Sequence, residues 1–149
     1  MAAWAGAVTL LTISDGRDDI GATVSAFCPV SADPPLVLVS LMAASYPAEV
    51  LAPGAGFAVT LLSASQRMLA GRFAASGRPG ARLMLDDIPH SRGAMSGALI
   101  PSDGLGVFEC SVTQLVPAGD HLLVIAEVTG IPYTSEAGSP LIRFRSRYL

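Results

Sequence analysis

The feature that most constrains the fold is a pair of strand patterns separated by a proline-rich break. From Gly21 onward, side chains alternate between two kinds, as they do in a strand with two different faces. Residues 31–35, Ser-Ala-Asp-Pro-Pro, interrupt the pattern, because proline fixes its backbone angle and cannot donate a ladder hydrogen bond. Residues 36–41 then form a continuous apolar run typical of a strand buried on both faces. The stretch predicts a strand, a tight polar turn and a second strand.

Further strand patterns are joined by turn signals. Residues 6–14 are predicted as a strand that ends in a hairpin-type turn at residues 15–17, Asp-Gly-Arg. Residues 56–62 are predicted as another strand. Residues 106–116 and 122–129 are two strands whose connection contains Ala-Gly-Asp, which predicts an antiparallel hairpin.

Helical signals are few and short. Pro47 suits the first turn of a short helix. Ser63 and Gln66 form a capping box, which predicts a helix from Ala64 to about Ala75. Residues 76–96 are punctuated by glycine and proline, so we expect an irregular or mobile segment. The sequence therefore predicts a mainly β protein, a closed antiparallel barrel with one or two short appended helices.

Composition limits the possible classes of protein. The 149 residues suit one domain, residues 1–149. The chain is 51% hydrophobic and only 14% charged, which favours burial of surface between subunits and hence a homodimer. The net charge of −3 has no basic block, which argues against nucleic acid as a partner. No apolar run reaches the roughly 20 residues that span a bilayer, and the first residues lack a signal-peptide pattern, so we expect no membrane association and a cytoplasmic location.

The two cysteines, Cys28 and Cys110, are far apart in the sequence. They have no metal-ligand spacing, and we expect no metal site. Both are expected to be buried thiols in a reducing compartment.

The stretch from Thr23 to Ser31, which precedes the two prolines, also has the composition of a ligand site. It concentrates small side chains, hydroxyl groups and unpaired backbone amides at Thr23, Ser25, Ala26, Cys28 and Ser31. A flat heterocycle with polar edges can lie against such a segment, because small side chains let the backbone approach and donate. The alternative is a corner of a barrel with no ligand.

The same stretch resembles the signature of the flavin reductase-like family. These are FMN-binding split barrels that include the small reductase components of two-component flavin monooxygenases. The matching residues, in family order, are Gly21, Thr23, Ser25, Phe27, Val30, Ser31, Asp33, Pro34, Pro35, Leu36 and Val37. Two further motifs match. The first lies in the predicted helix and consists of Gln66, Leu69, Ala70, Arg72, Phe73 and Ala74. The second consists of Gly119, Asp120 and His121, downstream of Glu109 and Cys110. The resemblance covers nearly the whole chain.

The resemblance implies a split barrel and an NAD(P)H:flavin oxidoreductase. In this family, hydride passes from the nicotinamide C4 to the flavin N5, so the protein binds and stacks two rings. The flavin is FMN or FAD, and the co-substrate is NADH or NADPH. The reduced flavin then serves a separate flavin-dependent monooxygenase. The sequence agrees, because it contains no paired carboxylates or nucleophile with its base.

The resemblance also implies roles for particular residues. The flavin would contact Thr23, Ser25, Ala26, Phe27, Cys28 and Ser31. Ser45 and Arg72 would meet its phosphate, Phe73 and Tyr148 would lie near the cofactor, and His121 would position the nicotinamide as the catalytic residue. Arg72 is equally explained as a solvated helix residue, and His121 as a histidine held by Asp120.

The sequence departs from the family pattern in three places. No basic residue stands beside Ser45, Thr60 replaces an asparagine, and Ser146 replaces a glycine. Two alternatives to a reductase therefore stay open. One is a flavin-binding protein without reductase activity, and the other is a dimeric interaction module that has lost the flavin site.

Overall fold

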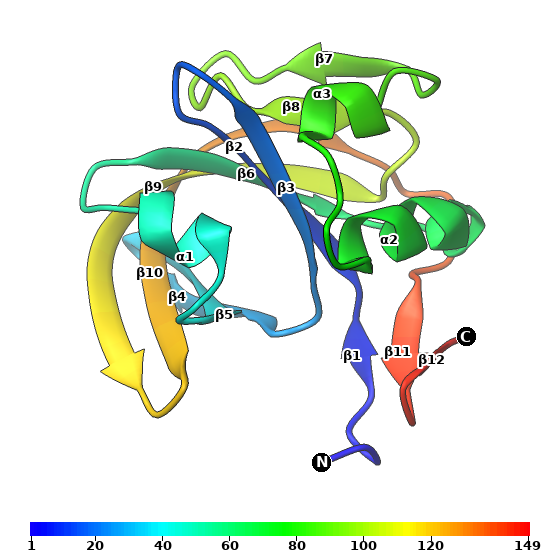
Figure 1. Cartoon of the computed structure of the whole chain (residues 1–149), viewed down its shortest axis with the longest axis horizontal. Helices are drawn as coiled ribbons and strands as arrows, with labels where there is room; N and C mark the ends of the chain where they lie inside the picture. The colour runs from blue at the N-terminus through cyan, green and yellow to red at the C-terminus, as the bar shows by residue number, and fades with distance from the viewer.

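The computed structural model describes all of residues 1–149, and a curled antiparallel sheet dominates it (Figure 1). The strand order is β3-β2-β6-β9-β10-β5-β4. The strands are β2 (Thr9–Ser14), β3 (Asp19–Val24), β4 (Phe27–Ala32), β5 (Pro35–Met42), β6 (Gly56–Leu61), β9 (Gly106–Ala118) and β10 (His121–Thr134). The first and last strands of this order, β3 and β4, follow one another in the sequence but are not paired. The sheet therefore curls into a barrel that is split between β3 and β4, as predicted.

Smaller elements surround the barrel. A three-stranded sheet joins β1 (Gly6–Ala7), β11 (Ile142–Phe144) and β12 (Arg147–Tyr148), so both chain ends lie together (Figure 1). β7 (His90–Arg92) pairs with β8 (Leu99–Pro101). The helices are α1 (Tyr46–Val50), the 3-10 turn η1 (Ala64–Gln66), α2 (Arg67–Ala74) and α3 (Ala81–Met84). Both α2 and α3 pack against β3, which is one of the two edge strands of the barrel.

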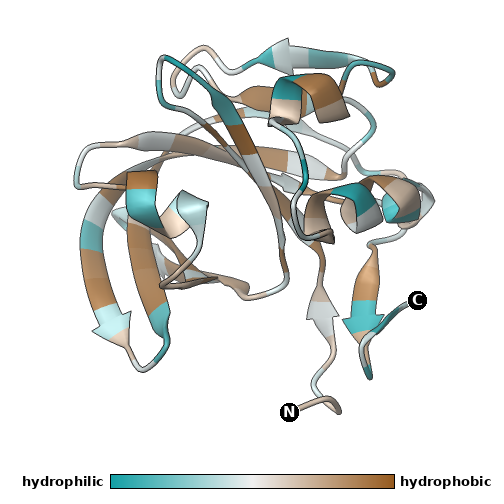
Figure 2. Cartoon of the chain, in the orientation of Figure 1, coloured by the Kyte–Doolittle hydropathy of each residue, from teal (hydrophilic) through white to brown (hydrophobic).

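Alternating side chains give the barrel wall two apolar faces. On β2, Leu11 and Ile13 point into the barrel, where they join Phe57 and other side chains in the larger core cluster. Leu10 points outward and packs in a second cluster with Phe73 of α2. The strands of the wall carry much of the hydrophobic colour in Figure 2, whereas the β2–β3 turn is hydrophilic. The apolar composition of the chain thus serves two cores, one inside the barrel and one beneath the helices.

Several predicted elements are confirmed, and one segment was predicted wrongly. The strands, the β9–β10 hairpin, the capping box and the position of Pro47 in α1 match the predictions. Residues 25–26 are an additional break, which sends β3 and β4 to opposite edges of the sheet. The segment 76–96, predicted as irregular, contains α3 and β7. Tertiary ion pairs fix this segment, and its local sequence gives no sign of them.

Asp19 is the centre of those ion pairs. The residue is only 3% exposed, and its carboxylate accepts hydrogen bonds from Arg82 of α3 and Arg92 of β7. These bonds, with Arg92 contributing most, hold the pKa of the Asp19 carboxyl below its ordinary value. A buried carboxylate needs such partners, because desolvation disfavours its charged form. Asp19 therefore ties α3 and β7 to the start of β3.

Two local features carry a cost in stability. The hydroxyl of Thr60 is buried without a hydrogen-bond partner. Arg145 and Ser146 form the two-residue turn between β11 and β12 with φ of 49° and 61°, a left-handed conformation that favours glycine. Both Thr60 and Ser146 are positions where the sequence departs from the family pattern.

None of the helices has the length and the apolar composition that a membrane-spanning helix requires.

Candidate functional site

A cleft of about 420 Å³ lies at the split of the barrel. Its wall is formed by β3, the link at residues 25–26, the end of β5 and the start of α1. The end of α2 with the segment that follows it, the start of β10, and β11 complete the wall. The polar and charged residues that line it are Thr23, Ser25, Ser40, Ser45, Arg78, His121 and Arg143. Apolar side chains lie between them, among them Val24, Leu41, Met42 and Phe73. Segments that are distant in the sequence thus share one polar-edged cleft.

The free edge of β3 faces this region. β3 pairs with β2 on one side only. The Arg78 Nε donates to the Gly21 carbonyl oxygen at 2.9 Å, so the backbone groups of Gly21 point away from β2. Those of Thr23 point the same way, because the backbone groups of successive residues in a strand face opposite sides. Backbone groups without a ladder partner are therefore available at the cleft, and such groups need a partner.

Close packing of α2 against β3 shapes the cleft wall. A Cβ at Gly21 would overlap with the Phe73 ring, so only glycine lets the helix approach this closely. The Thr23 hydroxyl donates to the Ala70 carbonyl oxygen at 2.6 Å. Thr23 and Phe73 both line the cleft, but each also joins β3 to α2.

Ser45 and two arginines give the cleft a site for an anion. Ser45 caps α1, and its hydroxyl accepts a hydrogen bond from the Ala48 amide at 3.4 Å. Arg78 lines the same wall and is held by the carbonyl oxygens of Gly21 and Ala75. Arg143 of β11 lines the cleft as well. The positive charge that the sequence lacks beside Ser45 is thus present in the cleft, from residues distant along the chain.

His121 lies on another wall of the cleft, at the first position of β10. Its Nδ1 is 2.7 Å from the Asp120 carboxylate, which leaves Nε2 without a partner in the chain. The hydrogen bond from His121 holds the pKa of the Asp120 carboxyl below its ordinary value. Asp120 therefore fixes the orientation of the imidazole, and the ring remains able to meet a ligand.

The structure brings six of the eleven predicted site residues to the cleft, namely Thr23, Ser25, Ala26, Ser45, Phe73 and His121. The other five, Phe27, Cys28, Ser31, Arg72 and Tyr148, do not line it. Arg72 forms a bidentate ion pair with Asp87, at 2.6 and 2.8 Å, and this pairing raises the pKa of Arg72. The ligand roles predicted for these five residues outside the cleft remain predictions.

Phe27 and Tyr148 have packing partners away from the cleft. The Phe27 ring stacks on Phe108 with 6.0 Å between centroids, and Tyr148 packs against the cluster beneath α2. Cys110 is buried, and burial raises the pKa of its thiol to about 12. Cys28 is exposed on the edge strand β4, so the expectation that both cysteines are buried is wrong for Cys28.

Among the cleft residues that sequence reasoning missed are Ser40, Met42, Arg78 and Arg143. Ser40 had a signal, because it is the only polar residue in the apolar run of β5. Arg78 had none, since it stands in a glycine- and proline-rich segment with no regular pattern.

The comparison with protein families decides how this cleft is interpreted. The model of the flavin reductase like domain matches residues 1–149. The chain belongs to this family. The family membership and the split-barrel fold predicted from the sequence are both confirmed.

Individual flavin reductases are similar to the chain over most of its length. It is 34% identical over 141 residues to the NADH-dependent FMN reductase AsuE2 of Streptomyces nodosus subsp. asukaensis, an alignment that covers 95% of this chain and 76% of that protein. It is 31% identical over 148 residues to the reductase component of 4-hydroxyphenylacetate 3-monooxygenase of Thermus thermophilus. That alignment covers 99% of this chain and 90% of that protein. The solved structure of the Streptomyces globisporus NADH:FAD oxidoreductase SgcE6, in complex with NAD and FAD fragments, matches with a TM-score of 0.90 at 26% identity, covering 99% of this chain and 86% of that chain.

The donors of the cleft fit the flavin that this family binds. A flavin has a flat ring with polar edges and an anionic phosphate tail. The cleft offers apolar side chains, free backbone groups along β3, the hydroxyls of Ser25 and Ser40, and the two arginines, Arg78 and Arg143. Its volume lies within the range of about 300–1,000 Å³ typical of small-molecule sites.

Proposed function

We propose that residues 1–149 act as one domain, an NAD(P)H-dependent flavin reductase that supplies reduced flavin to a partner monooxygenase. The family assignment confirms the flavin reductase activity predicted from the sequence. The observation that carries the proposal is the cleft at the barrel split, where the free edge of β3, an anion site and His121 share one space.

The chain binds and orients two ligands, while the flavin supplies the ring that accepts hydride from NAD(P)H. Backbone groups of β3 and the link at Ser25 and Ala26 hold the polar edge of the ring. Ser45 and Arg78 hold the phosphate, because a guanidinium donates in a fixed planar geometry. This arrangement replaces the adjacent basic residue that family members carry beside the serine.

His121 positions the nicotinamide. Asp120 holds Nδ1, which leaves the Nε2 edge free to donate to or accept from the co-substrate. The protein would not have to supply an acid or a base, because the bound flavin would itself be the hydride acceptor and the chain would only hold the two ligands in place. His121 therefore acts by orientation rather than as an acid or base.

Related reductases use FMN or FAD with NADH, and we propose the same choice of ligands for this chain. One relative is named as the reductase component of a monooxygenase, which supports a flavin-dependent monooxygenase as the partner. Both cysteines are free thiols, which supports a reducing compartment, and we place the protein in the cytoplasm. Fractionation of cells that express the protein tests this location.

We further propose a homodimer. Large hydrophobic side chains are exposed on the barrel, among them Ile131 and Tyr133 at the end of β10. Met95 is exposed as well and lies against Gly130, next to Ile131. Exposed large apolar side chains in this number favour burial against a second copy of the chain. Light scattering on the purified protein tests the proposal, and a monomeric mass would refute it.

Stopped-flow mixing tests the reductase function. The protein is loaded with FMN or FAD and mixed with NADH or NADPH without oxygen. Rapid loss of the oxidised flavin absorbance is expected. His121→Ala should slow the loss while leaving flavin affinity unchanged, and His90→Ala is the matched control, because His90 is exposed on β7 away from the cleft. Flavin that binds but is not reduced would favour the flavin-binding alternative.

A further inference from the structure

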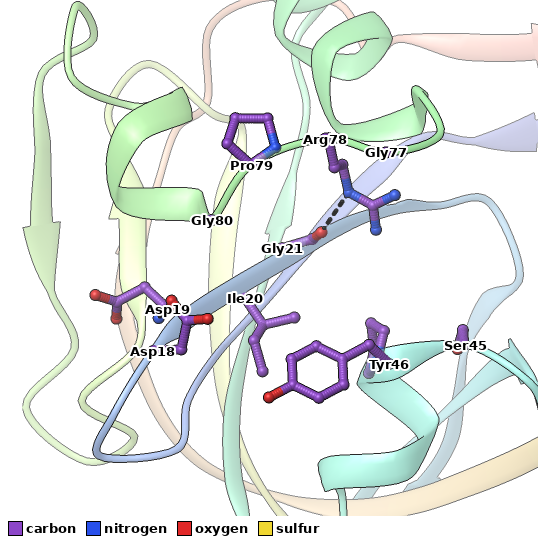
Figure 3. Close-up of a pocket in the computed structure, with 11 residues that line it drawn as sticks. Asp18, Asp19, Ile20, Gly21, Ser45, Tyr46, Gly77, Arg78, Pro79 and Gly80 are labelled. Carbon is purple, nitrogen blue, oxygen red and sulfur yellow. Dashed lines mark hydrogen bonds between the residues drawn. The ribbon is translucent and has the colours of Figure 1, made fainter.

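A second cavity lies next to the flavin cleft and shares part of its wall. It has a volume of about 320 Å³. The two cavities have Ser45, Pro47 and Arg78 in common. Beyond these shared residues, the second cavity extends along the start of β3 to Asp18 and to Gly80, the residue before α3 (Figure 3). Family members bind flavins that differ at this end of the molecule, because FMN stops at its phosphate whereas FAD continues into a second phosphate and an adenosine.

Arg78 stands at the junction of the two cavities. Its Nε and Nη1 donate to the carbonyl oxygens of Gly21 and Ala75, at 2.9 and 3.2 Å, which fixes the plane of the guanidinium. Its Nη2 makes no hydrogen bond within the chain. Figure 3 shows the guanidinium above the β3 backbone, with its outer nitrogens directed away from the Gly21 carbonyl. A ligand phosphate bound by Arg78 would therefore lie between the two cavities, and the rest of the ligand could extend into both of them.

The far part of the second cavity has groups that suit a nucleoside. Tyr46 is 49% exposed, and its ring lies beside Ile20 in this cavity, which gives a base a face on which to stack. Asp18 is exposed, and only its Oδ1 is engaged, by the Asp19 amide at 3.0 Å. A carboxylate with a free oxygen accepts hydrogen bonds from ribose hydroxyls, as acidic residues do in dinucleotide sites.

The charges of the cavity agree with this orientation. The positive Arg78 lies at the junction, where phosphates would sit. The charge of Asp19 is balanced by Arg82 and Arg92, so Asp18 is the free carboxylate at the far end. An uncharged nucleoside fits that end better than a third phosphate would.

We infer that the second cavity binds the adenosine of FAD, so that this chain prefers FAD to FMN. The inference rests on the proposed flavin reductase function. The isoalloxazine occupies the cleft at the barrel split, the two phosphates meet Arg78, and the adenosine lies between Tyr46 and Asp18. The adenosine of NAD(P)H has the same chemistry, and the experiment separates the two sources.

The test is a fluorescence titration of the purified protein with FAD and with FMN. The wild type should bind FAD more tightly than FMN. Tyr46→Ala should weaken FAD binding about tenfold, the size of one base stacked on one aromatic ring, and leave FMN binding unchanged. Asp18→Asn should act in the same direction. Met68→Ala is the control, because Met68 is an exposed side chain of α2 that lines neither cavity.

Three results would overturn the inference. In the first, the wild type binds both flavins equally well. In the second, Tyr46→Ala weakens the binding of both flavins to the same extent. In the third, Tyr46→Ala leaves both flavins unaffected but weakens NAD⁺ binding to the FMN-loaded protein, measured by calorimetry, which would assign the cavity to the nicotinamide co-substrate. Failure of the wild type to bind either flavin is a different result, since it would refute the proposed function itself.

Discussion

Asp19 provides a quantitative test of how the segment that carries Arg78 is held in place. Asp19→Asn keeps the shape of the side chain but removes the charge that Arg82 and Arg92 share. The carboxylate receives four N–H contacts of 2.8–3.2 Å. Breaking a buried ion pair typically costs about 3–5 kcal/mol. The two arginine side chains keep 73% and 45% exposure and can return to water, so we expect the lower end, about 3 kcal/mol.

Urea denaturation at neutral pH measures this loss of unfolding free energy. Asp87→Asn is the matched control, because Asp87 makes a similar bidentate contact with Arg72 at the surface. Exposed ion pairs contribute about 0–1 kcal/mol, so the unfolding free energy of the control should fall by no more than about 1 kcal/mol. Equal losses for the two variants would refute the argument that burial makes the Asp19 contacts important.

The pH dependence of stability gives the same prediction an independent check. The pKa of Asp19 is lowered in the folded protein, so its contribution is fully present above the unfolded value of about 4. The contribution is lost as the pH falls below that value and passes through the folded pKa. The stability difference between wild type and Asp19→Asn should therefore shrink in acid, and a constant difference down to pH 2 would contradict the assignment.

Four other substitutions test separate parts of the structure. Thr60→Val removes an unsatisfied buried hydroxyl and should raise stability by about 1 kcal/mol. Thr12→Val instead breaks the 2.6 Å hydrogen bond to the Leu99 carbonyl oxygen and should lower stability by about 1 kcal/mol. Thermal unfolding measures both changes. Ser146→Gly should raise stability by about 1 kcal/mol, because glycine adopts the left-handed turn without strain, and an unchanged Tm would contradict this. Arg78→Ala should weaken FMN binding about tenfold or more, the size of a charged hydrogen bond, but not that of riboflavin, which has no phosphate. Equal weakening of both ligands would show that Arg78 supports the cleft without meeting the phosphate.

The sequence predicts the fold well where local chemistry decides it. Proline, glycine and capping signals placed the β2–β3 and β9–β10 turns, α1 and the start of α2, because each depends on a few neighbouring residues. It failed for α3 and β7, where the long-range pairing of Asp19 with Arg82 and Arg92 supplies the order. The local pattern there is only that of a glycine-rich loop.

The same distinction applies to the candidate site. Thr23, Ser25 and Ala26 could be found because they lie within one motif that also carries the family resemblance. Arg78 and Arg143 could not, because the barrel closure and the terminal sheet bring them to the cleft from distant parts of the chain.

Flavin binding followed by reduction tests the central claim most directly. FMN and FAD are titrated separately onto the purified protein, and NADH is then added without oxygen to whichever complex forms. The account predicts saturable binding and rapid bleaching of the bound flavin. Absence of binding by either flavin would contradict it, because the cleft at the barrel split would then have another role.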